Sequence, residues 1–270
     1  MFCKNQPDTW FSTITETSEM KNKLPDESKT MVIIPTYNNE RTLAAVIESV
    51  LSHTTDVLVV NDGATDSTSE ILKTFADRIR ILSYHPNKGK GYALRCAFRE
   101  ALKLGFDHAV TIDSDGQHSA ADIPKFIESI RTNPGALLVG SRGLVHDNMA
   151  STSTFANRFS NFWFTLQTFR KLPDTQSGFR LYPLYRMGKM KMFTTRYETE
   201  LEYLVFSAWR NIRIIPIPIS VHYDPPSEKV SHFRPFHDFF RISVLNTVLV
   251  FLAFIYGYPS MLIRKIAAKF

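Results

Sequence analysis

From residue 30 to residue 140 the chain alternates short apolar runs with longer segments of helical periodicity. A short apolar run bounded by polar residues is typical of a buried strand, and apolar residues spaced by three and four are typical of an amphipathic helix. Strands are predicted at residues 31–35, 56–60, 79–82, 108–112 and 136–140, and helices at residues 40–52, 68–75, 89–104 and 121–131. Strands that alternate with helices in this way form a parallel α/β sheet.

Polar residues gather directly after four of the predicted strands. The carboxyl ends of parallel strands lie at one edge of a sheet, and ligands of open α/β sheets bind at that edge. We therefore expect the polar clusters to form one binding site. The clusters are residues 36–40, Asn61-Asp62-Gly63, Asn87-Lys88-Gly89 and Asp113-Ser114-Asp115.

Asp113 and Asp115 come directly after the predicted strand at residues 108–112, with one residue between them. Side chains alternate along an extended chain, so both carboxylates point the same way and repel each other. A divalent cation bound to a phosphate would remove that repulsion, and Mg²⁺ in proteins takes one or two carboxylates together with phosphate oxygens. An Asp-x-Asp pair by itself is more often a solvated turn. Its place among the other polar clusters favours a metal site.

The chain of 270 residues has a formal net charge of +6 and a pI of about 9.2. A basic balance favours an anionic partner, which could be a nucleotide, a nucleic acid or an acidic membrane surface. Cys3 and Cys96 give neither a disulfide framework nor the spacing of a metal site. Residues 1–30 are polar and lack the apolar segment of a signal peptide, so we expect a mobile arm. A start of translation at Met20 or Met31 stays open.

Five motifs occur in a fixed order and together resemble the family 2 glycosyltransferases of the GT-A fold. They are Pro35-Thr36-Tyr37-Asn38-Asn39-Glu40, Asn61-Asp62-Gly63, Asn87-Lys88-Gly89-Lys90-Gly91, Asp113-Ser114-Asp115-Gly116-Gln117-His118 and Ser177-Gly178-Phe179-Arg180. The subgroup that they resemble most is the dolichol- or polyprenyl-phosphate sugar transferases. The resemblance covers about residues 31–225 and implies a Rossmann-like, mostly parallel sheet flanked by helices.

The resemblance also implies which residues hold the donor and the metal. The residues implied to bind a nucleotide sugar are Pro35, Tyr37, Asn38, Glu40, Asp62, Lys88, Gly89, Asp113 and Ser114. Asp62 would accept a hydrogen bond from the base, and Asn61 replaces the usual first acid of that motif. A divalent cation, Mg²⁺ or Mn²⁺, would be held by Asp113, Asp115 and Gln117.

The implied reaction is inverting, metal-dependent transfer of a sugar from a UDP- or GDP-linked donor to a polyprenyl (dolichyl-type) phosphate. Arginine suits phosphate oxygens, and Arg142, Arg158 and Arg180 are the candidates to bind the acceptor phosphate. A phosphate acceptor needs no strong general base, whereas a hydroxyl acceptor does. The candidate bases are Asp174, Glu198, Glu200 and Glu202. The expected catalytic residues are Asp115, Arg142, Asp174, Arg180 and Glu200.

Residues 242–263 carry no charge, and basic residues follow them. At about 1.5 Å per residue one continuous helix of this length would span the apolar core of a bilayer, but Gly257 and Pro259 interrupt it. We expect a helix that is embedded in a membrane or lies on it, with a full span and a buried core helix as the alternatives. The aromatic segment at residues 155–169 is expected to face either the core or lipid headgroups.

These expectations divide the chain into an arm at residues 1–30, a GT-A glycosyltransferase domain at residues 31–228 and a membrane-associated tail at residues 229–270. The protein is expected at the cytoplasmic face of a membrane, peripheral or tail-anchored. Transfer to a lipid or saccharide hydroxyl stays an alternative. A nucleotidyltransferase is a weaker one, because residues 31–40 contain no glycine. Binding of nucleic acid is not favoured, because acidic side chains gather at the strand ends.

Overall fold

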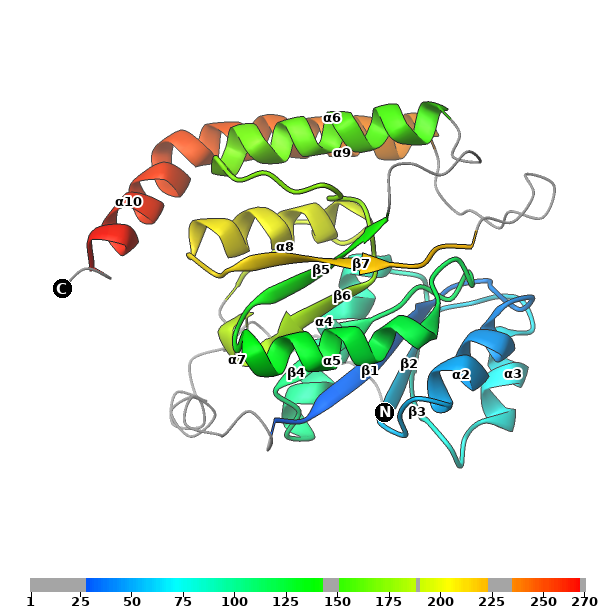
Figure 1. The fold of residues 1–270 in the computed structure, drawn as a ribbon. Coiled ribbons are helices and arrows are strands. Elements are labelled where there is room, and N and C mark those ends of the chain that lie inside the picture. The colour runs from blue at the N-terminus through cyan, green and yellow to red at the C-terminus, as the bar shows by residue number, and fades with distance from the viewer. Residues whose placement is uncertain (1–27, 143–150, 188–189, 223–234, 268–270) are drawn as a thin grey trace.

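The computed structural model describes residues 28–142, 151–187, 190–222 and 235–267 (Figure 1). Residues 1–27 of the predicted N-terminal arm lie outside the described residues. The strands of the first half are β1 (Thr30–Thr36), β2 (Val57–Asp62), β3 (Arg80–Tyr84), β4 (His108–Thr111) and β5 (Leu137–Arg142). The helices between them are α2 (Leu43–Leu51), α3 (Thr68–Thr74), α4 (Lys90–Lys103) and α5 (Ile123–Thr132), and a 3₁₀ turn at Ala120–Asp122 leads into α5. All of these strands and α-helices form close to where the sequence predicts them.

Seven strands form one mixed sheet in the order β3-β2-β1-β4-β6-β5-β7. Strand β6 (Arg180–Pro183) runs antiparallel to β4 and β5, and the other neighbouring strands are parallel. Strand β7 (Ile214–Ile219) forms the edge next to β5. The predicted, mostly parallel α/β sheet is confirmed, but β6 and β7 were not predicted. Strand β7 contains Pro216 and Pro218, which cannot donate ladder hydrogen bonds and are therefore tolerated at a sheet edge.

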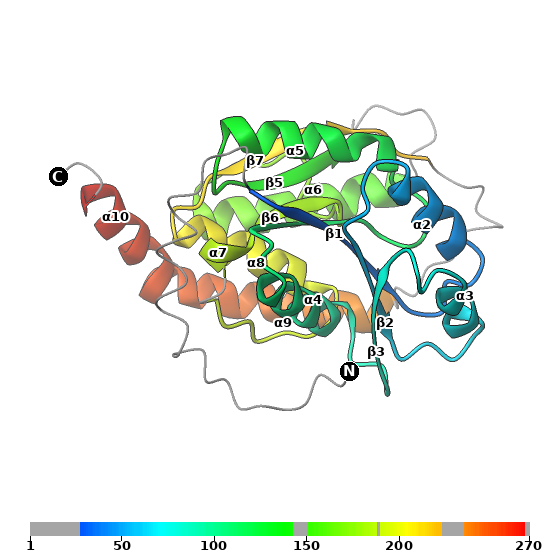
Figure 2. The same cartoon turned by 90° about the horizontal axis from the view of Figure 1, so that it is seen from below.

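The alternation of side chains along β1 divides the core into two parts. Met31 and Ile33 pack into one apolar cluster with residues of α4 and α8 (Glu198–Trp209). Val32 and Ile34 pack into the other cluster with residues of α2, α3 and α5. The short helix α7 (Leu184–Met187) belongs to the first cluster. Figure 2 shows the sheet between these two groups of helices.

A further helical layer covers α8 on the side away from the sheet (Figure 1). It consists of α6 (Ser151–Thr168), α9 (Pro235–Leu252), a π-helical segment at Ala253–Gly257 and α10 (Tyr258–Ala267). The side-chain amide of Gln167 donates to Asn246 Oδ1 at 2.9 Å in the buried contact between α6 and α9. Trp209 of α8 donates from its indole nitrogen to the Gln167 carbonyl at 2.8 Å, and Gly257 lies directly against the Trp209 ring. These contacts dock the C-terminal helices onto the rest of the fold.

The predicted interruption of the C-terminal helix is wrong. The chain passes Gly257 in a π-helical segment and continues to Ala267, with Pro259 in the first turn of α10, where proline is tolerated. Residues 239–267 therefore form one helical stretch, with a mean hydropathy of 2.0 in its most apolar window, and by length and composition this stretch could cross a membrane. Leu245, Leu249 and Ala253 on its inner side are buried.

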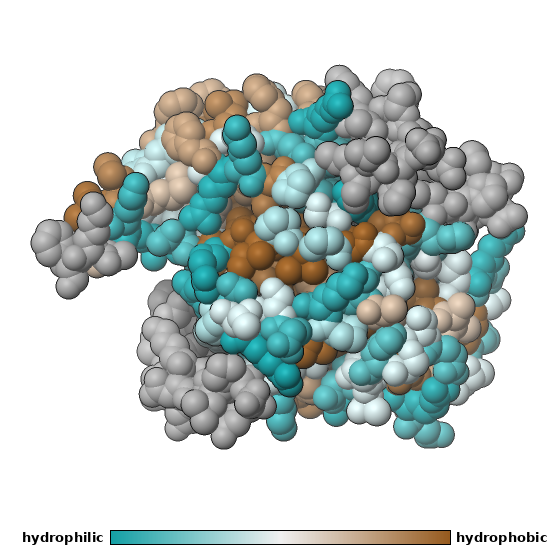
Figure 3. Space-filling view, viewed as in Figure 1, coloured by the Kyte–Doolittle hydropathy of each residue, from teal (hydrophilic) through white to brown (hydrophobic). Residues whose placement is uncertain are grey.

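The outer side of this layer exposes many large apolar side chains. We call this surface the outer apolar face. On α6 and directly after it, the face includes Phe162, Leu166 and Phe169. On the C-terminal helices it includes Phe239, Phe240, Val244, Val248, Phe251, Phe254, Ile255, Leu262, Ile263 and Ile266. Figure 3 shows apolar side chains along α6 and α9 at the top of the view. Exposed apolar side chains in this number on one helical layer mark a contact with a membrane or with another protein.

Candidate functional site

A cavity of about 730 Å³ opens at the carboxyl ends of β1, β2 and β4, as expected from the polar clusters. The starts of α4 and α8 complete its wall. The lining includes seven of the predicted site residues, Pro35, Tyr37, Asp62, Gly89, Asp113, Ser114 and Asp115. The cavity is also lined by residues that were not predicted to act, among them Asn39, Thr65, Lys90, Arg196 and Tyr197.

Asp62 at the end of β2 positions the loop that precedes α4. Its Oδ1 accepts the backbone N–H of Lys88 at 2.7 Å, and its Oδ2 accepts the backbone N–H of Gly89 at 2.8 Å and the side-chain amide of Asn87 at 3.0 Å. Burial raises the pKa of the Asp62 carboxyl, although these hydrogen bonds act in the opposite direction. Asp62 therefore shapes one wall of the cavity; a hydrogen bond from it to a base stays a prediction.

Asn38 and Glu40 connect the loop after β1 to the loop after β2. Asn38, which has a φ of 50°, accepts the backbone N–H of Thr65 on its Oδ1 at 2.8 Å. Glu40 accepts the backbone N–H of Ser67 on its Oε2 at 3.0 Å. Both side chains thus fix loop geometry, while Tyr37 beside them lines the cavity. Lys88 turns toward α4, with its Nζ 4.6 Å from the centre of the Tyr92 ring.

The paired acids of the Asp-x-Asp segment lie on the floor of the cavity with Lys90 between two carboxylates. The Lys90 Nζ is 2.6 Å from Asp113 Oδ1 and 3.0 Å from Glu200 Oε2. The Lys90 side chain is 13% exposed and that of Glu200 8%, so this is a largely desolvated group of charges. The two carboxylates raise the pKa of the Lys90 ammonium even though burial acts to lower it. Glu200 is thereby brought to the predicted metal site.

Asp113 and Asp115 differ strongly in their electrostatics. Burial would raise the pKa of Asp113, but the charges of Lys90 and other neighbouring cations outweigh it, so the pKa lies below its usual range. Burial and the negative charge of Asp113 raise the pKa of Asp115 to about 6. A Cβ at Gly178 would collide with Asp113 Oδ2 and lie 2.7 Å from Lys90 Nζ, so glycine leaves room for this group of charges. Two carboxylate ligands under mutual repulsion fit a hard divalent cation.

The other predicted members of the site lie around this centre. Ser114 is buried, and its hydroxyl accepts the side-chain amide of Asn39 at 2.5 Å. Gln117 donates its backbone N–H to Asp115 Oδ1 at 3.0 Å, which supports the turn; a metal contact of its side chain stays a prediction. Arg158 is exposed on α6, and its contact with an acceptor phosphate also stays a prediction.

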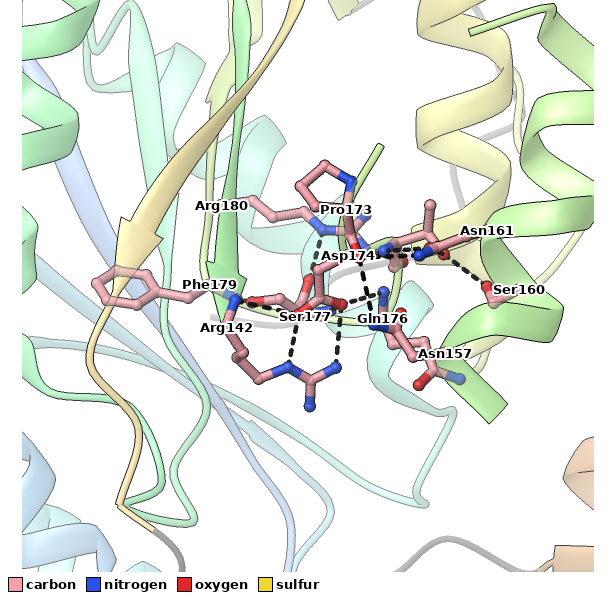
Figure 4. Close-up of polar contacts among 11 residues, drawn as sticks. Arg142, Asn157, Ser160, Asn161, Pro173, Asp174, Gln176, Ser177, Phe179 and Arg180 are labelled. Atoms are coloured by element: carbon pink, nitrogen blue, oxygen red, sulfur yellow. Dashed lines mark hydrogen bonds and ion pairs between the residues drawn. The ribbon is translucent and has the colours of Figure 1, made fainter. Parts of the chain in front are cut away.

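Arg142 at the end of β5 forms a bidentate pair with Asp174 (Figure 4). Arg142 Nε donates to Asp174 Oδ2 at 2.6 Å, and Nη2 donates to Oδ1 at 3.0 Å. The Asp174 carboxylate also accepts the backbone N–H groups of Gln176 and Ser177. Burial acts to raise the pKa of Asp174, but the hydrogen bonds and the charge of Arg142 keep it below its usual range. A carboxylate in this setting is a poor general base, so Asp174 is better described as the residue that orients Arg142.

The phosphate contact predicted for Arg180 requires a correction. The Arg180 side chain is fully buried, and its guanidinium donates to three backbone carbonyls, those of Ser177 at 2.7 Å, Glu200 at 2.6 Å and Thr175 at 2.9 Å. These bonds join the loop before β6 to α8 (Figure 4 shows the bond to Ser177). Arg180 therefore acts as a structural cross-link whose charge lowers the pKa of Asp113 from a distance. The sequence motif suggested a phosphate contact because the sequence alone does not show that the Arg180 side chain is buried.

The chain is similar to known proteins in both sequence and structure. Residues 31–193 match the family model described as glycosyl transferase family 2. A UDP-N-acetylglucosamine–dolichyl-phosphate N-acetylglucosaminyltransferase of Methanococcus voltae is 30% identical in an alignment of 213 residues that covers 71% of this chain and 85% of the relative. A dolichyl-phosphate beta-glucosyltransferase of Saccharomyces cerevisiae is 26% identical over 71% of this chain and 66% of its own length. A glucosyl-3-phosphoglycerate synthase of Mycobacterium tuberculosis, crystallised with UDP, shares the fold with a TM-score of 0.61 and 20% identity over 89% of this chain and 84% of that chain.

Proposed function

The chain belongs to glycosyl transferase family 2, and from this we propose that it transfers a sugar from a nucleotide-sugar donor to a polyprenyl (dolichyl-type) phosphate at a membrane surface. The names of the relatives from Methanococcus voltae and Saccharomyces cerevisiae support a lipid-phosphate acceptor. The observation that carries the proposal is the cavity at the strand ends, which brings Asp62, Asp113 and Asp115 together beneath the starts of two helices.

The donor half of the site suits a nucleoside diphosphate with a divalent cation. Asp113 and Asp115 would hold the cation, with Gln117 as a further predicted ligand. When bound, the cation neutralises charge that develops on the leaving diphosphate. Lys90 fixes the orientation of Asp113 and links it to Glu200, and Pro35 and Tyr37 line the part of the cavity beside Asp62.

The acceptor half rests on Arg142, which Asp174 holds in a defined orientation by two hydrogen bonds. A guanidinium held in a fixed orientation by a bidentate carboxylate has the planar donor geometry that suits the oxygens of a phosphate. A lipid phosphate is already ionised near pH 7 and attacks the anomeric carbon without a strong base. The low pKa of Asp174 is compatible with this route, because the residue does not need to take up a proton.

The outer apolar face supports a membrane-bound acceptor. Helices α6 and α9 are far apart in sequence but lie side by side, and both expose large apolar side chains (Figure 1 shows the two helices). Because α9 contacts both α6 and α8, the geometry favours helices that lie in the membrane interface over a tail that crosses the bilayer. The protein would then be a peripheral one on the cytoplasmic face, where nucleotide sugars are present.

Transfer to a hydroxyl remains the second candidate because of Glu200. Its Oε1 is buried and has no hydrogen-bond partner among the described residues, while its Oε2 is bound to Lys90. A carboxylate that is bound to a residue of the cavity wall, and that has one oxygen without a hydrogen bond from the described residues, could accept a proton from an acceptor hydroxyl.

A transfer assay with radiolabelled UDP- and GDP-sugars, Mg²⁺ or Mn²⁺, and vesicles that contain polyprenyl phosphate tests the proposal. Label is expected in a mild-acid-labile polyprenyl-linked product, and it should be absent without the lipid phosphate. Transfer to free polyprenol or to a saccharide, with none to the phosphate, would favour the hydroxyl reaction instead. Absence of transfer from every donor to any of these acceptors would overturn both.

A further inference from the structure

The segment Phe193–Arg196, which we call the strap, crosses the start of α4 and is held by buried anchors. Glu202 of α8, which is fully buried, accepts the backbone N–H of Phe193 on Oε1 at 2.6 Å and that of Thr194 on Oε2 at 3.1 Å. Arg95 of α4 donates to the Thr194 carbonyl at 2.5 Å, and the backbone N–H of Tyr92 donates to the Thr195 carbonyl at 3.0 Å. A buried carboxylate is costly unless it is well satisfied, so this anchoring fixes the strap firmly.

The strap places the side chain of Arg196 over Gly89, in the wall of the cavity. A Cβ at Gly89 would come within 2.7 Å of Arg196 Cγ and 2.7 Å of the Thr195 carbonyl oxygen, so the two segments touch only because residue 89 is glycine. Gly89 has a φ of 96° and is the N-cap residue of α4, where it provides no side chain to cap the first turn. Arg196 thus lies beside the positive end of a helix, where an anion is favoured.

A charge inventory of the cavity wall shows what Arg196 can bind. The acids in the wall are Asp62, Asp113 and Asp115, and the two long cationic side chains are Lys90 and Arg196. Lys90 is committed to Asp113 and Glu200. Among the described residues Arg196 has no ion pair, and its charge acts on Asp62 only from a distance, where it lowers a pKa that burial raises. The guanidinium of Arg196 is therefore available to an anionic ligand.

We propose that Arg196 binds the diphosphate of the nucleotide-sugar donor. This inference rests on the proposed function and deepens it by naming a residue that binds the donor, on the opposite side of Gly89 from Asp62. The location favours the donor over the acceptor phosphate, because Arg196 adjoins the Asp62–Gly89 wall, whereas the acceptor arginine Arg142 lies at the end of β5 beside Asp174. A planar guanidinium can bind oxygens of both phosphate groups at once.

The test measures binding of UDP and GDP, with Mn²⁺, to the full chain by calorimetry. Arg196→Ala is expected to weaken binding of the nucleoside diphosphate that the wild type prefers by about tenfold or more, since charge-assisted hydrogen bonds are lost. Arg196→Lys should restore part of the affinity. The affinity for the matching nucleoside monophosphate should change less, and the KM for polyprenyl phosphate should stay within about twofold. Arg131→Ala, on the exposed side of α5, is the matched control and should bind like the wild type.

Three results would overturn the inference. The first is an Arg196→Ala variant that binds the nucleoside diphosphate like the wild type. The second is unchanged diphosphate affinity with a raised KM for polyprenyl phosphate, which would assign Arg196 to the acceptor. The third is a thermal midpoint of Arg196→Ala far below that of Arg131→Ala together with equal losses for the mono- and diphosphate, which would show a structural role. A wild-type protein that binds neither UDP nor GDP would overturn the proposed function itself.

Discussion

The guanidinium of Arg241 holds the carboxylate of Glu198, with Nη2 at 2.6 Å and Nε at 3.0 Å from Oε1. Arg241 belongs to α9 in the outer layer, and Glu198 is the first residue of α8, two residues from both Arg196 and Glu200. The Glu198 side chain is 3% exposed, whereas that of Arg241 is 43% exposed. This ion pair therefore joins α9 to the start of α8, next to Tyr197 in the wall of the cavity.

Replacement of Arg241 should destabilise the fold. Arg241→Ala leaves a buried carboxylate without its cation, and we expect the free energy of unfolding to fall by about 1–3 kcal/mol. The double variant Arg241→Gln with Glu198→Gln removes both charges and should recover much of that loss. Urea unfolding in detergent, followed by tryptophan fluorescence, measures the difference. An Arg241→Ala protein with the wild-type midpoint would show that the pair contributes nothing.

Membrane binding should depend on exposed apolar side chains of the tail. Phe251, Phe254 and Ile255 are each more than 60% exposed, and their combined replacement by serine should lower the partition onto phospholipid vesicles at least about tenfold. The core side of α9 is untouched, so the thermal midpoint should hardly change. Leu104→Ser, an exposed apolar residue at the end of α4, is the matched control and should float with vesicles like the wild type. Unchanged flotation of the triple variant would contradict a role of this surface.

The repulsion between Asp113 and Asp115 should lower the stability of the metal-free fold, although the pair is needed to bind the metal. Asp115 has a pKa of about 6, above its usual range, so its ionised form is disfavoured in the folded state. Without metal, the free energy of unfolding should therefore decrease as pH rises from 4 through 6. Asp115→Asn removes this repulsion and should raise the thermal midpoint at pH 7 in EDTA, while it abolishes stabilisation by Mn²⁺. A variant that is less stable than the wild type in EDTA, or that still responds to Mn²⁺, would refute this.

Metal affinity should also depend on pH in a defined direction. A proton on Asp115 competes with the cation, so Mn²⁺ affinity should be constant above about pH 7 and fall by up to tenfold per pH unit below the pKa of about 6. Electron paramagnetic resonance of free Mn²⁺ between pH 5 and 8 follows this directly. Asp62→Asn, outside the metal pair, is the control and should keep the same pH profile. A flat profile in the wild type would place the metal elsewhere.

The sequence predicted the first five strands because apolar runs are visible in the local sequence. It also predicted that the polar clusters converge, because each cluster follows directly after one of these strands. It missed β6, which begins with Arg180 and ends at Pro183 and therefore lacks a continuous apolar run, and β7, whose two prolines argue against a strand except at an edge. Lys90 and Arg196 were missed because spacing does not show where a long side chain ends. Arg180 was assigned to phosphate for the converse reason, since only the fold shows that three carbonyls occupy its guanidinium.

Asp174 should act through Arg142, and two variants distinguish this from a role as general base. Asp174→Asn leaves Arg142 with one acceptor in place of two, so the KM for polyprenyl phosphate should rise about tenfold while the affinity for the nucleoside diphosphate stays unchanged. Arg142→Lys keeps the charge but loses the fork, and it should raise the same KM. Because the pKa of Asp174 lies below its usual range, Asp174 stays ionised over the pH range of the assay. The dependence of kcat on pH should therefore show no decrease at low pH that comes from protonation of Asp174. If Asp174→Asn abolished kcat at saturating acceptor while Arg142→Lys remained active, Asp174 would be the base and the transfer would resemble that to a hydroxyl.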